Sequence, residues 1–236
     1  MEKKQLTEPV CKIIARIHTD FPEKFGVPRQ SGLIDTLYGT VTFETAYRDP
    51  AAVRGLEEFS HIWLLWQFSQ CLREGWSPTV RPPRLGGNTR MGVFATRSPY
   101  RPNAIGLSCV RLLKVVPETP DGPLLYVAGA DLVDGTPIYD IKPYLPFTDS
   151  HPEAEGGFAE LVKDHALQVF CSDDLLATVP ESRRAPLLAV LAHDPRPAYH
   201  HDPERIYGLD FAGMAVRFQV KERKLTVISL EQAAED

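Results

Sequence analysis

MGVFATRSPYRPNAIGLS, residues 91–108, places two arginines and two prolines between two strand-like apolar runs. Pro99 and Pro102 each fix φ and disfavour helix at the residue before them, so residues 98–103 must be extended or turned. Arg97 and Arg101 therefore project from a stiff backbone, which loses little entropy when it binds an anion. The stretch predicts two strands joined by a rigid cationic loop. The alternative is an ordinary proline-rich connection with solvated arginines.

Short strands dominate the first 130 residues. Runs rich in β-branched and aromatic residues predict strands over 10–18, 41–45, 61–68, 91–96, 105–116 and 124–128. Between them, only AAVRGLEE at 51–58 favours a helix. Many short strands with few crossover helices favour an antiparallel barrel or sandwich over a doubly wound sheet. We expect a mainly β protein, with a small antiparallel β-barrel over residues 1–150.

The texture of the sequence changes after residue 144. LPFTDSHPEAEGG at 145–157 is polar and rich in Pro and Gly, which is typical of a linker or long surface loop. Beyond it, the pattern predicts helices at 158–167, 173–178 (N-cap Ser172) and 183–191, and a hairpin of 216–220 and 225–227 around KERK. We expect residues 158–236 to form a smaller α+β module that can be removed without unfolding the barrel.

Charge is distributed unevenly along the chain. The net charge is −5 over 236 residues, yet residues 75–114 contain no Asp or Glu and seven Arg or Lys. This asymmetry predicts a polyanionic partner for one face of the molecule. No apolar run approaches the ~20 residues that span a bilayer, and MEKKQL does not lead into a signal peptide. We expect a cytoplasmic protein with no membrane contact.

Cysteine and histidine spacing argues against metal chemistry. The four cysteines, at 11, 71, 109 and 171, have no CxxC spacing, so we expect reduced core residues. The pair His200–His201 precedes Asp202 but lacks a third or fourth ligand at suitable spacing, so no metal site is expected. Gly86–Gly87 lies outside the strand-GxGxxG-helix context that a dinucleotide site requires. No GxSxG, HExxH or Walker sequence occurs either.

Three other segments carry polar residues in turns or at strand ends. In ADLVDGTPIYDIKPY, residues 130–144, the turn Asp134–Pro137 should expose backbone donors and acceptors, although most such turns are only hairpin connections. Pro28-Arg29-Gln30 places a cation and an amide after a rigid residue; it could equally be a solvated loop. Ser60 and His61 lie where a strand begins, and a histidine there is more often structural than catalytic.

Taken together, five strings resemble the TsaA/TrmO family of S-adenosylmethionine-dependent tRNA methyltransferases. They are PRQ (28–30), GLEEFSHIWLL (55–65), GVFATRSPYRPNAIGLS (92–108), DLVDGTPIYDIKPY (131–144) and DPERIYGLDF (202–211). The resemblance covers nearly the full length, and the third and fourth strings are highly specific. It implies a β-barrel methyltransferase with S-adenosylmethionine bound near a homodimer interface. The target it implies is the adenosine 3′ of a tRNA anticodon, which carries threonylcarbamoyl on N6 and receives the methyl group on that nitrogen.

The resemblance also implies the residues of the site. The residues expected to surround the cofactor are Pro28, Arg29, Gln30, Ser60, His61, Arg97, Leu107, Asp134, Gly135, Thr136 and Pro137. The urea-like N6 nitrogen is a poor nucleophile, so a group should help to remove its proton; Asp140, Lys142 and Tyr144 are the candidates. The anticodon stem-loop phosphates should meet Arg81, Arg84, Arg90 and Arg101.

Two questions stay open in the sequence. Tyr207 and Phe211, in a C-terminal module that would help to recognise tRNA, could stack on unpaired bases or pack in a core. The whole protein could also be a non-catalytic binder of an adenosyl metabolite or RNA, or a hydrolase of a small anion. The missing nucleophile-base pair argues against a hydrolase, and the long cationic stretch argues against a small-molecule sensor.

Overall fold

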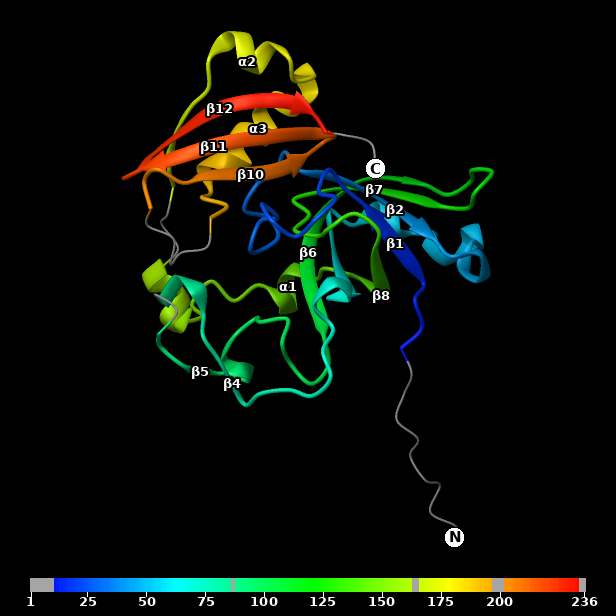
Figure 1. Cartoon of the computed structure of the whole chain (residues 1–236). Coiled ribbons are helices and arrows are strands. Elements are labelled where there is room, and N and C mark those ends of the chain that lie inside the picture. Colours follow the sequence, from blue (N-terminus) through cyan, green and yellow to red (C-terminus); the bar gives the residue numbers. More distant parts are fainter. Residues whose placement is uncertain (1–10, 86–87, 163–165, 197–201, 234–236) are drawn as a thin grey trace.

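Six strands close into an antiparallel barrel in the order β1-β2-β7-β6-β3-β8 (Figure 1). The computed structural model describes residues 11–85, 88–162, 166–196 and 202–233. The barrel strands are β1 (Ala15–His18), β2 (Tyr38–Phe43), β3 (His61–Gln67), β6 (Ile105–Val116), β7 (Leu124–Ala128) and β8 (Thr136–Pro143). The prediction of a mainly β protein with an N-terminal barrel is confirmed.

The barrel alternates inward and outward side chains. In β3, HIWLLWQ, Ile62, Leu64 and Trp66 are buried inside, whereas the other four residues point outward and are only partly buried. Strand β6 pairs with β3 in its first half and with β7 in its second half. Strand β3 thus lies between β6 and β8, and its outward residues share one face with theirs.

Three long connections leave the barrel at the same end. Residues 19–37 join β1 to β2, residues 68–104 join β3 to β6, and residues 129–135 join β7 to β8. The antiparallel register requires this, because the last residues of β1, β3 and β7 pair near the first residues of β2, β6 and β8. Most of the predicted site residues lie on or next to these connections.

The connection 68–104 carries its own small sheet. Its elements are η4 (Ser69–Cys71), β4 (Thr79–Val80), η5 (Pro83–Leu85), β5 (Met91–Gly92) and the 3-10 helix η6 (Val93–Ala95). The predicted strand 91–96 was therefore wrong beyond Gly92. There the Thr96 N–H and hydroxyl both donate to the Val93 carbonyl and close a turn.

Three other sequence predictions need correction. The strand predicted from residue 10 begins only at Ala15, and residue 10 itself lies outside the described residues. Strand β2 ends at Phe43, before η1 (Thr45–Tyr47). The helix predicted at 51–58 is two 3-10 helices, η2 (Pro50–Val53) and η3 (Leu56–Glu58), because Gly55 between them has a φ of +84°.

Strand β8 was not predicted. Prolines 137 and 143 and the polar residues between them hide its alternation in the sequence.

The C-terminal module is a four-stranded sheet packed with helices. Its order is β10-β11-β12-β9, and β9 is parallel to β12. The elements after the barrel are α1 (Pro146–Asp149), η7 (Gly157–Val162), β9 (Gln168–Phe170), α2 (Asp173–Ala177), α3 (Glu181–Ala192), β10 (Ile206–Phe211), β11 (Met214–Lys221) and β12 (Lys224–Gln232). The Ser172 N-cap is confirmed, since its hydroxyl accepts the Leu175 N–H at 3.3 Å. The helix predicted at 158–167 is only a 3-10 helix that ends at Val162, and residues 163–165 lie outside the described part.

A hydrophobic core fills each part, and the second core reaches into the first part. Phe21, Ile34 and Leu37 belong to the connection 19–37 but are buried among side chains of the C-terminal module. The Phe21 and Phe211 rings lie 5.2 Å apart, edge to face. Figure 1 shows the C-terminal sheet above the barrel, over this connection. The structure therefore argues against the expected removable module, because removal would expose these three side chains.

Side-chain burial decides two smaller predictions. All four cysteines are free, but Cys11 is exposed and the other three are only partly buried, so they are not core residues. Tyr207 and Phe211 are buried, which excludes base stacking on them. No helix among the described residues is long and apolar enough to cross a membrane.

Candidate functional site

The outer face of strands β6, β3 and β8 collects predicted site residues from distant parts of the sequence. Leu107 lies opposite Leu65, and Leu65 lies opposite Asp140 on the other side. In the next row, Trp63 lies between Cys109 and Lys142. Neighbouring strands are about 4.8 Å apart, so Leu107 and Asp140 lie roughly 10 Å from each other. Leu107 is 52% exposed, so this apolar face is open in a single chain.

Ser60 and His61 lie at the start of β3. The Ser60 hydroxyl and the His61 Nδ1 are 3.0 Å apart, and the Tyr144 N–H donates to the His61 carbonyl at 3.0 Å. The Tyr144 ring packs against the rings of His61 and Trp63, with centroids 6.2 and 5.7 Å away. The structure thus brings the candidate residues Ser60, His61 and Tyr144 together.

Asp140 and Lys142 form an ion pair on the same outer face. The Lys142 Nζ lies 2.9 Å from the Asp140 Oδ2, and the Asp140 Oδ1 accepts the Ile141 N–H at 2.9 Å. Both side chains are partly exposed, so the ion pair contributes little to stability. The ammonium and the hydrogen bond instead hold the carboxylate in one orientation beside Leu65.

Arg97 and Gln30 meet at the end of the barrel where the three connections emerge. The Arg97 guanidinium donates to the Gln30 Oε1, and the Gln30 amide donates to the Arg29 carbonyl. Arg29 also donates to the Arg196 carbonyl in the C-terminal module at 3.3 Å. The connections 19–37 and 68–104 are joined here, and an exposed guanidinium stands at their junction.

Asp131, which the sequence analysis did not assign to the site, lies in the connection 129–135 and joins the connection 19–37 to strands β3 and β6. Its Oδ1 accepts the Ser108 hydroxyl at 2.5 Å, and that hydroxyl accepts the Trp66 indole N–H at 2.9 Å. The Ser31 N–H donates to the same carboxylate. The Trp66 ring fits only because residue 106 is glycine: a Cβ there would lie 2.3 Å from it. Asp131 was visible in the DLVDGTP string, but only the fold places it beside Ser31 and Ser108.

Burial shifts the pKa of the Asp131 carboxyl away from its ordinary value. Burial raises its pKa to about 6, against the opposing effects of the hydrogen bonds from Ser108, its own N–H and Ser31 and of the Arg97 charge. The ionised form is therefore unfavourable in the folded protein. Groups with strongly shifted pKa values are enriched at functional sites, and together with its contacts to Ser31 and Ser108 this makes Asp131 a further candidate residue.

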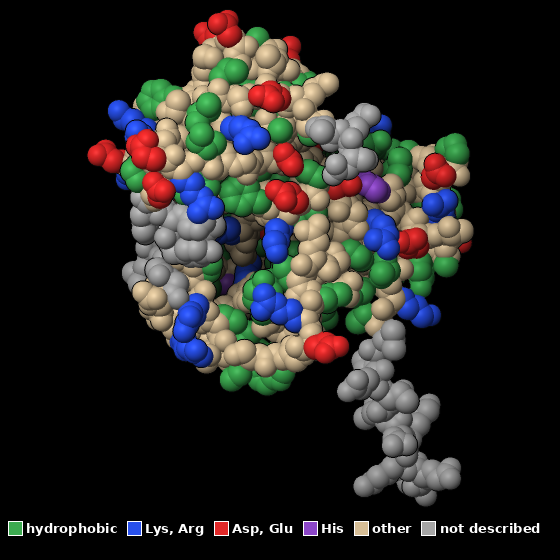
Figure 2. Space-filling view, viewed as in Figure 1, with side chains coloured by type: hydrophobic (Ala, Val, Ile, Leu, Met, Phe, Trp, Pro, Cys, Tyr) green, Lys and Arg blue, Asp and Glu red, His purple; other side chains and the backbone are tan. Residues whose placement is uncertain are grey.

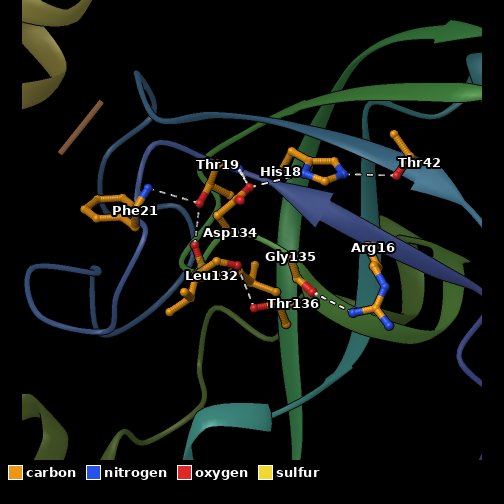
Figure 3. Close-up of polar contacts among 10 residues, drawn as sticks. Arg16, His18, Thr19, Phe21, Thr42, Leu132, Asp134, Gly135 and Thr136 are labelled. Carbon is orange, nitrogen blue, oxygen red and sulfur yellow. Dashed lines mark hydrogen bonds and ion pairs between the residues drawn. The ribbon is translucent and has the colours of Figure 1, made fainter. Parts of the chain in front are cut away.

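The turn Asp134–Pro137 is fixed to the end of β1 (Figure 3). One Asp134 oxygen accepts the Thr19 N–H at 3.0 Å, and Arg16 donates to the Gly135 carbonyl at 3.1 Å. The N–H groups of the turn donate within the protein: Asp134 to Phe21 and Gly135 to Ile17, both at 2.8 Å, and Thr136 to Val133 at 3.2 Å. The predicted exposed donors were therefore wrong, since neighbouring carbonyls take all three. The Thr136 and Pro137 side chains are buried as well.

The structure does not bring all predicted cofactor residues together in one chain. Arg97 and Gln30 lie at the end of the barrel where β3 finishes, whereas His61 lies where β3 begins. A seven-residue strand spans roughly 20 Å, which separates the two groups. Leu107 lies on β6 opposite Leu65 of β3, on the open surface between the two groups.

The cationic residues occupy the connection 68–104. Arg81 and Arg90 are exposed, and Arg90 donates to the Thr79 hydroxyl at 3.2 Å. Arg101 donates to the Thr96 carbonyl at 3.0 Å and so stabilises its own loop. Arg84 lies in η5, where only the backbone is described. Figure 2 shows Lys and Arg side chains around a hollow below the C-terminal module.

The metal and dinucleotide predictions concern different parts of the chain. Among the described residues, no group of three or more His, Cys, Asp or Glu could hold a metal ion. The pairs His200–His201 and Gly86–Gly87 lie outside the described residues.

Known proteins match this chain over nearly its whole length. Residues 16–150 match the tRNA-methyltransferase O N-terminal domain, and residues 165–233 match the TrmO C-terminal domain. A tRNA (adenine(37)-N6)-methyltransferase of Escherichia coli is 45% identical over 226 residues, which cover 92% of this chain and 96% of the relative. RcsF of Pseudomonas aeruginosa, named as a candidate S-adenosylmethionine-dependent methyltransferase, is 41% identical over 83% of this chain and 86% of its own length.

A solved structure gives the same result for the fold. The crystal structure of TrmO from Pseudomonas aeruginosa superposes with a TM-score of 0.77 at 31% identity, covering 98% of this chain and all of that one. The two proteins thus share their fold over nearly the whole chain. The chain belongs to the TrmO family.

Proposed function

We propose that this protein transfers a methyl group from S-adenosylmethionine to N6 of adenine 37 in tRNA, on a base that already carries threonylcarbamoyl. The observation that carries the proposal is the outer face of β6, β3 and β8. Leu107, a cofactor candidate, and Asp140, a candidate proton acceptor, lie on either side of Leu65 in the strand register. Two relatives that match 92% and 75% of this chain are named tRNA (adenine(37)-N6)-methyltransferase.

The residues present fit the cofactor. The exposed Arg97 guanidinium beside Gln30 suits the carboxylate of a methionine group, because arginine binds carboxylates with two parallel donors. Leu107 and Leu65 offer an apolar surface for an adenine ring. The resemblance to the family adds Pro28, His61 and Asp134 to the residues expected around the cofactor. When bound, S-adenosylmethionine supplies a methyl group on a positively charged sulfur.

Asp140 is the group proposed to accept the proton from N6. A lysine ammonium has donors only, so Lys142 cannot act as the base in its charged form. The Asp140 carboxylate is held by Lys142 and the Ile141 N–H, and it stands beside the apolar strip where the adenine would lie. Most of the rate enhancement would come from holding the nitrogen in line with the methyl group.

A second copy of the chain completes the site in this proposal. The group around Arg97 and the group around His61 lie at opposite ends of β3, and the surface between them is apolar and open. In an antiparallel pair of barrels, His61 of one copy would approach Arg97 of the other across a two-fold axis. The proposed state is therefore a homodimer, working in the cytoplasm.

The two parts of the chain have different proposed tasks. Residues 1–150 hold the cofactor and perform the chemistry, and residues 158–236 contribute to tRNA recognition while supporting the connection 19–37. Arg81 and Arg90 are exposed and would contact anticodon-loop phosphates in a salt-dependent manner. Arg101 would position its loop rather than bind RNA.

Methyl transfer to defined RNA tests the proposal. Purified protein is incubated with labelled S-adenosylmethionine and an anticodon stem-loop, with or without threonylcarbamoyl, and the nucleosides are analysed by mass spectrometry. We expect a new methyl group on N6 of adenine 37 only in the modified substrate. Binding of cofactor and RNA without any methylated nucleoside would favour the alternative of a non-catalytic binder.

Arginine variants separate the two proposed binding functions. Arg97→Ala should weaken cofactor binding about tenfold or more, since it removes a charge-assisted hydrogen bond. Arg81→Ala should leave cofactor binding unchanged and reduce the salt dependence of tRNA binding by about one unit of slope. Calorimetry and a salt titration measure the two effects. Equal losses in both assays for both variants would contradict the division.

A further inference from the structure

Two aromatic side chains stack on each other at the surface of the connection 68–104. The Trp76 and Phe94 rings have centroids 6.1 Å apart and planes inclined by 29°. Trp76 is 54% exposed and Phe94 is 72% exposed, so each ring presents an open face to solvent. Large aromatic side chains left this open on a folded protein often mark a binding surface.

The β4–β5 ribbon creates the pair. Thr79 lies opposite Gly92, and the Val93 N–H donates to the Pro78 carbonyl at 2.9 Å, so the two chain segments continue side by side beyond the strands. Trp76 precedes β4 by three residues, and Phe94 follows β5 by two. The pairing therefore places both rings at one end of the ribbon, outside the two hydrophobic cores.

The surroundings of the pair favour an anionic ligand. Arg81 directly follows β4 and Arg90 directly precedes β5, so these two exposed arginines lie at the other end of the same short ribbon. Residues 75–114 contain no acidic residue. The nearest acid along the chain is Glu74, which precedes this segment. Exposed aromatic rings among arginines are the combination that binds single-stranded nucleic acids, since rings stack on bases and arginines contact phosphates.

The pair also lies close to the cofactor candidate Arg97. Arg97 is three positions after Phe94, and even a fully extended chain would span only about 10 Å over that distance. Here the segment begins with a 3-10 helix, which is shorter. Stacked nucleotides rise about 3.4 Å each, so a base on this pair would lie within a few nucleotides of a base at the cofactor.

We propose that Trp76 and Phe94 form a stacking platform for an unpaired nucleobase of the anticodon loop, next to the adenosine that is methylated. This inference rests on the proposed function, which supplies the RNA. The platform would hold the loop open and fix its register, while the arginines of the ribbon supply sequence-independent affinity. Stacking tolerates any base, so the platform selects an unpaired nucleotide rather than a sequence.

Binding of a fluorescent anticodon stem-loop to Trp76→Ala and Phe94→Ala tests the platform. Loss of one stacking partner should weaken RNA binding about fivefold to a hundredfold. Trp76→Phe should restore most of the affinity, because it keeps an aromatic ring. The slope of affinity against salt should not change, since a ring neutralises no phosphate. Cofactor affinity, measured by calorimetry, should also be unchanged.

Tyr38→Ala is the matched control. Tyr38 is an aromatic residue 44% exposed on β2, which lies across the barrel from β3 in the strand order. The Tyr38→Ala variant should bind the stem-loop as tightly as the natural protein does. A stem-loop that lacks one base supplies the second half of the test. When the missing base is the one that stacks on the platform, the natural protein should bind this RNA more weakly, whereas Trp76→Ala should bind it as it binds the intact stem-loop.

Three results would overturn the inference, each in a recognisable way. Trp76→Ala and Phe94→Ala could bind RNA as well as Tyr38→Ala, which would remove the platform but leave the proposed function intact. A changed oligomeric state in size-exclusion chromatography would make the pair a contact between protein chains instead. If the natural protein and the control both fail to bind the stem-loop, the proposed function itself fails, and the platform fails with it.

Discussion

The two hydrophobic cores of this protein are built differently. The barrel core uses side chains of the barrel strands and the segments next to them, all before residue 142. The C-terminal core, by contrast, includes Phe21, Ile34 and Leu37 from the connection between β1 and β2. That connection carries Pro28, Arg29 and Gln30. A segment that belongs to the barrel by sequence is thus shaped by the module that follows it, and the predicted cofactor loop depends on both.

The largest expected effect comes from ending the chain at residue 150. Phe21, Ile34 and Leu37 would then be exposed together, and burying three such side chains is worth about 5–9 kcal/mol. We expect an aggregating protein with little cofactor affinity, measured by size-exclusion chromatography and calorimetry. Replacing the three side chains by serine in the shortened chain should restore solubility without restoring cofactor binding.

The opposite result would show that the connection 19–37 does not depend on the C-terminal core. If the shortened natural sequence is soluble and binds S-adenosylmethionine as the full chain does, the connection 19–37 keeps its conformation without the module. The barrel would then be independent in the way that the sequence alone suggested.

Asp131 holds the connection 19–37 from the barrel side through Ser31, and Asp131→Asn tests this contribution of the barrel. The folded-state pKa of about 6 lies above the usual 3.8, so the folded protein binds the proton more tightly than the unfolded chain does. Stability therefore falls as the pH rises from about 4 to 6, and the ionised carboxyl costs about 3 kcal/mol above that range. Asp131→Asn removes this cost, so we expect a higher melting temperature than the natural protein at pH 7.5 and a similar one at pH 4.

The same variant should weaken the site while stabilising the fold. The amide introduced by Asp131→Asn has no charge to orient Arg97, so cofactor binding should fall although the melting temperature rises. Ser108→Ala is the control, since it removes a hydrogen bond to Asp131 without removing the charge. A loss of both stability and binding at pH 7.5 in Asp131→Asn would mean that the carboxyl is only structural.

The smallest effect is expected on the module side, from Arg183→Ala. The Arg183 Nη1 lies 2.9 Å from the Asp20 Oδ2, which joins α3 to the start of the connection 19–37. Burial raises the pKa of Asp20, and Arg183 counters this shift. Removing the cation should cost about 1–2 kcal/mol of stability and slightly weaken cofactor binding. Arg217→Ala, an exposed arginine on β11, should change neither quantity in chemical denaturation or calorimetry.

Sequence patterns predicted strands better than their connections. The runs 105–116 and 124–128 coincide with β6 and β7, because uninterrupted β-branched and apolar residues leave little choice. Strand β8 was hidden by Pro137, Pro143 and its polar residues. The segment 91–96 is apolar enough for a strand, but local hydrogen bonds from Thr96 to the Val93 carbonyl close a turn there, and apolar periodicity does not reveal such a turn.

The site could be predicted only as a set of residues, without their arrangement. Motif strings named Leu107 and His61, but only the strand register places them on one face and separates His61 from Arg97. Asp131 shows the limit most clearly. Its importance comes from contacts with Ser31 and Ser108, which are distant in sequence, and no local pattern encodes such contacts.

The closure of the barrel has a consequence for the order in which the parts of the protein fold during synthesis. Strand β1 is completed by β8, and Arg16 contacts Gly135, 119 residues later in the chain. At usual rates of synthesis, β1 waits on the order of ten seconds for its partner on the ribosome. The connection 19–37 waits longer still, since Phe21 is buried only when β10 to β12 have been made. A nascent chain therefore acquires its cofactor loop only after strands β10 to β12 have been translated.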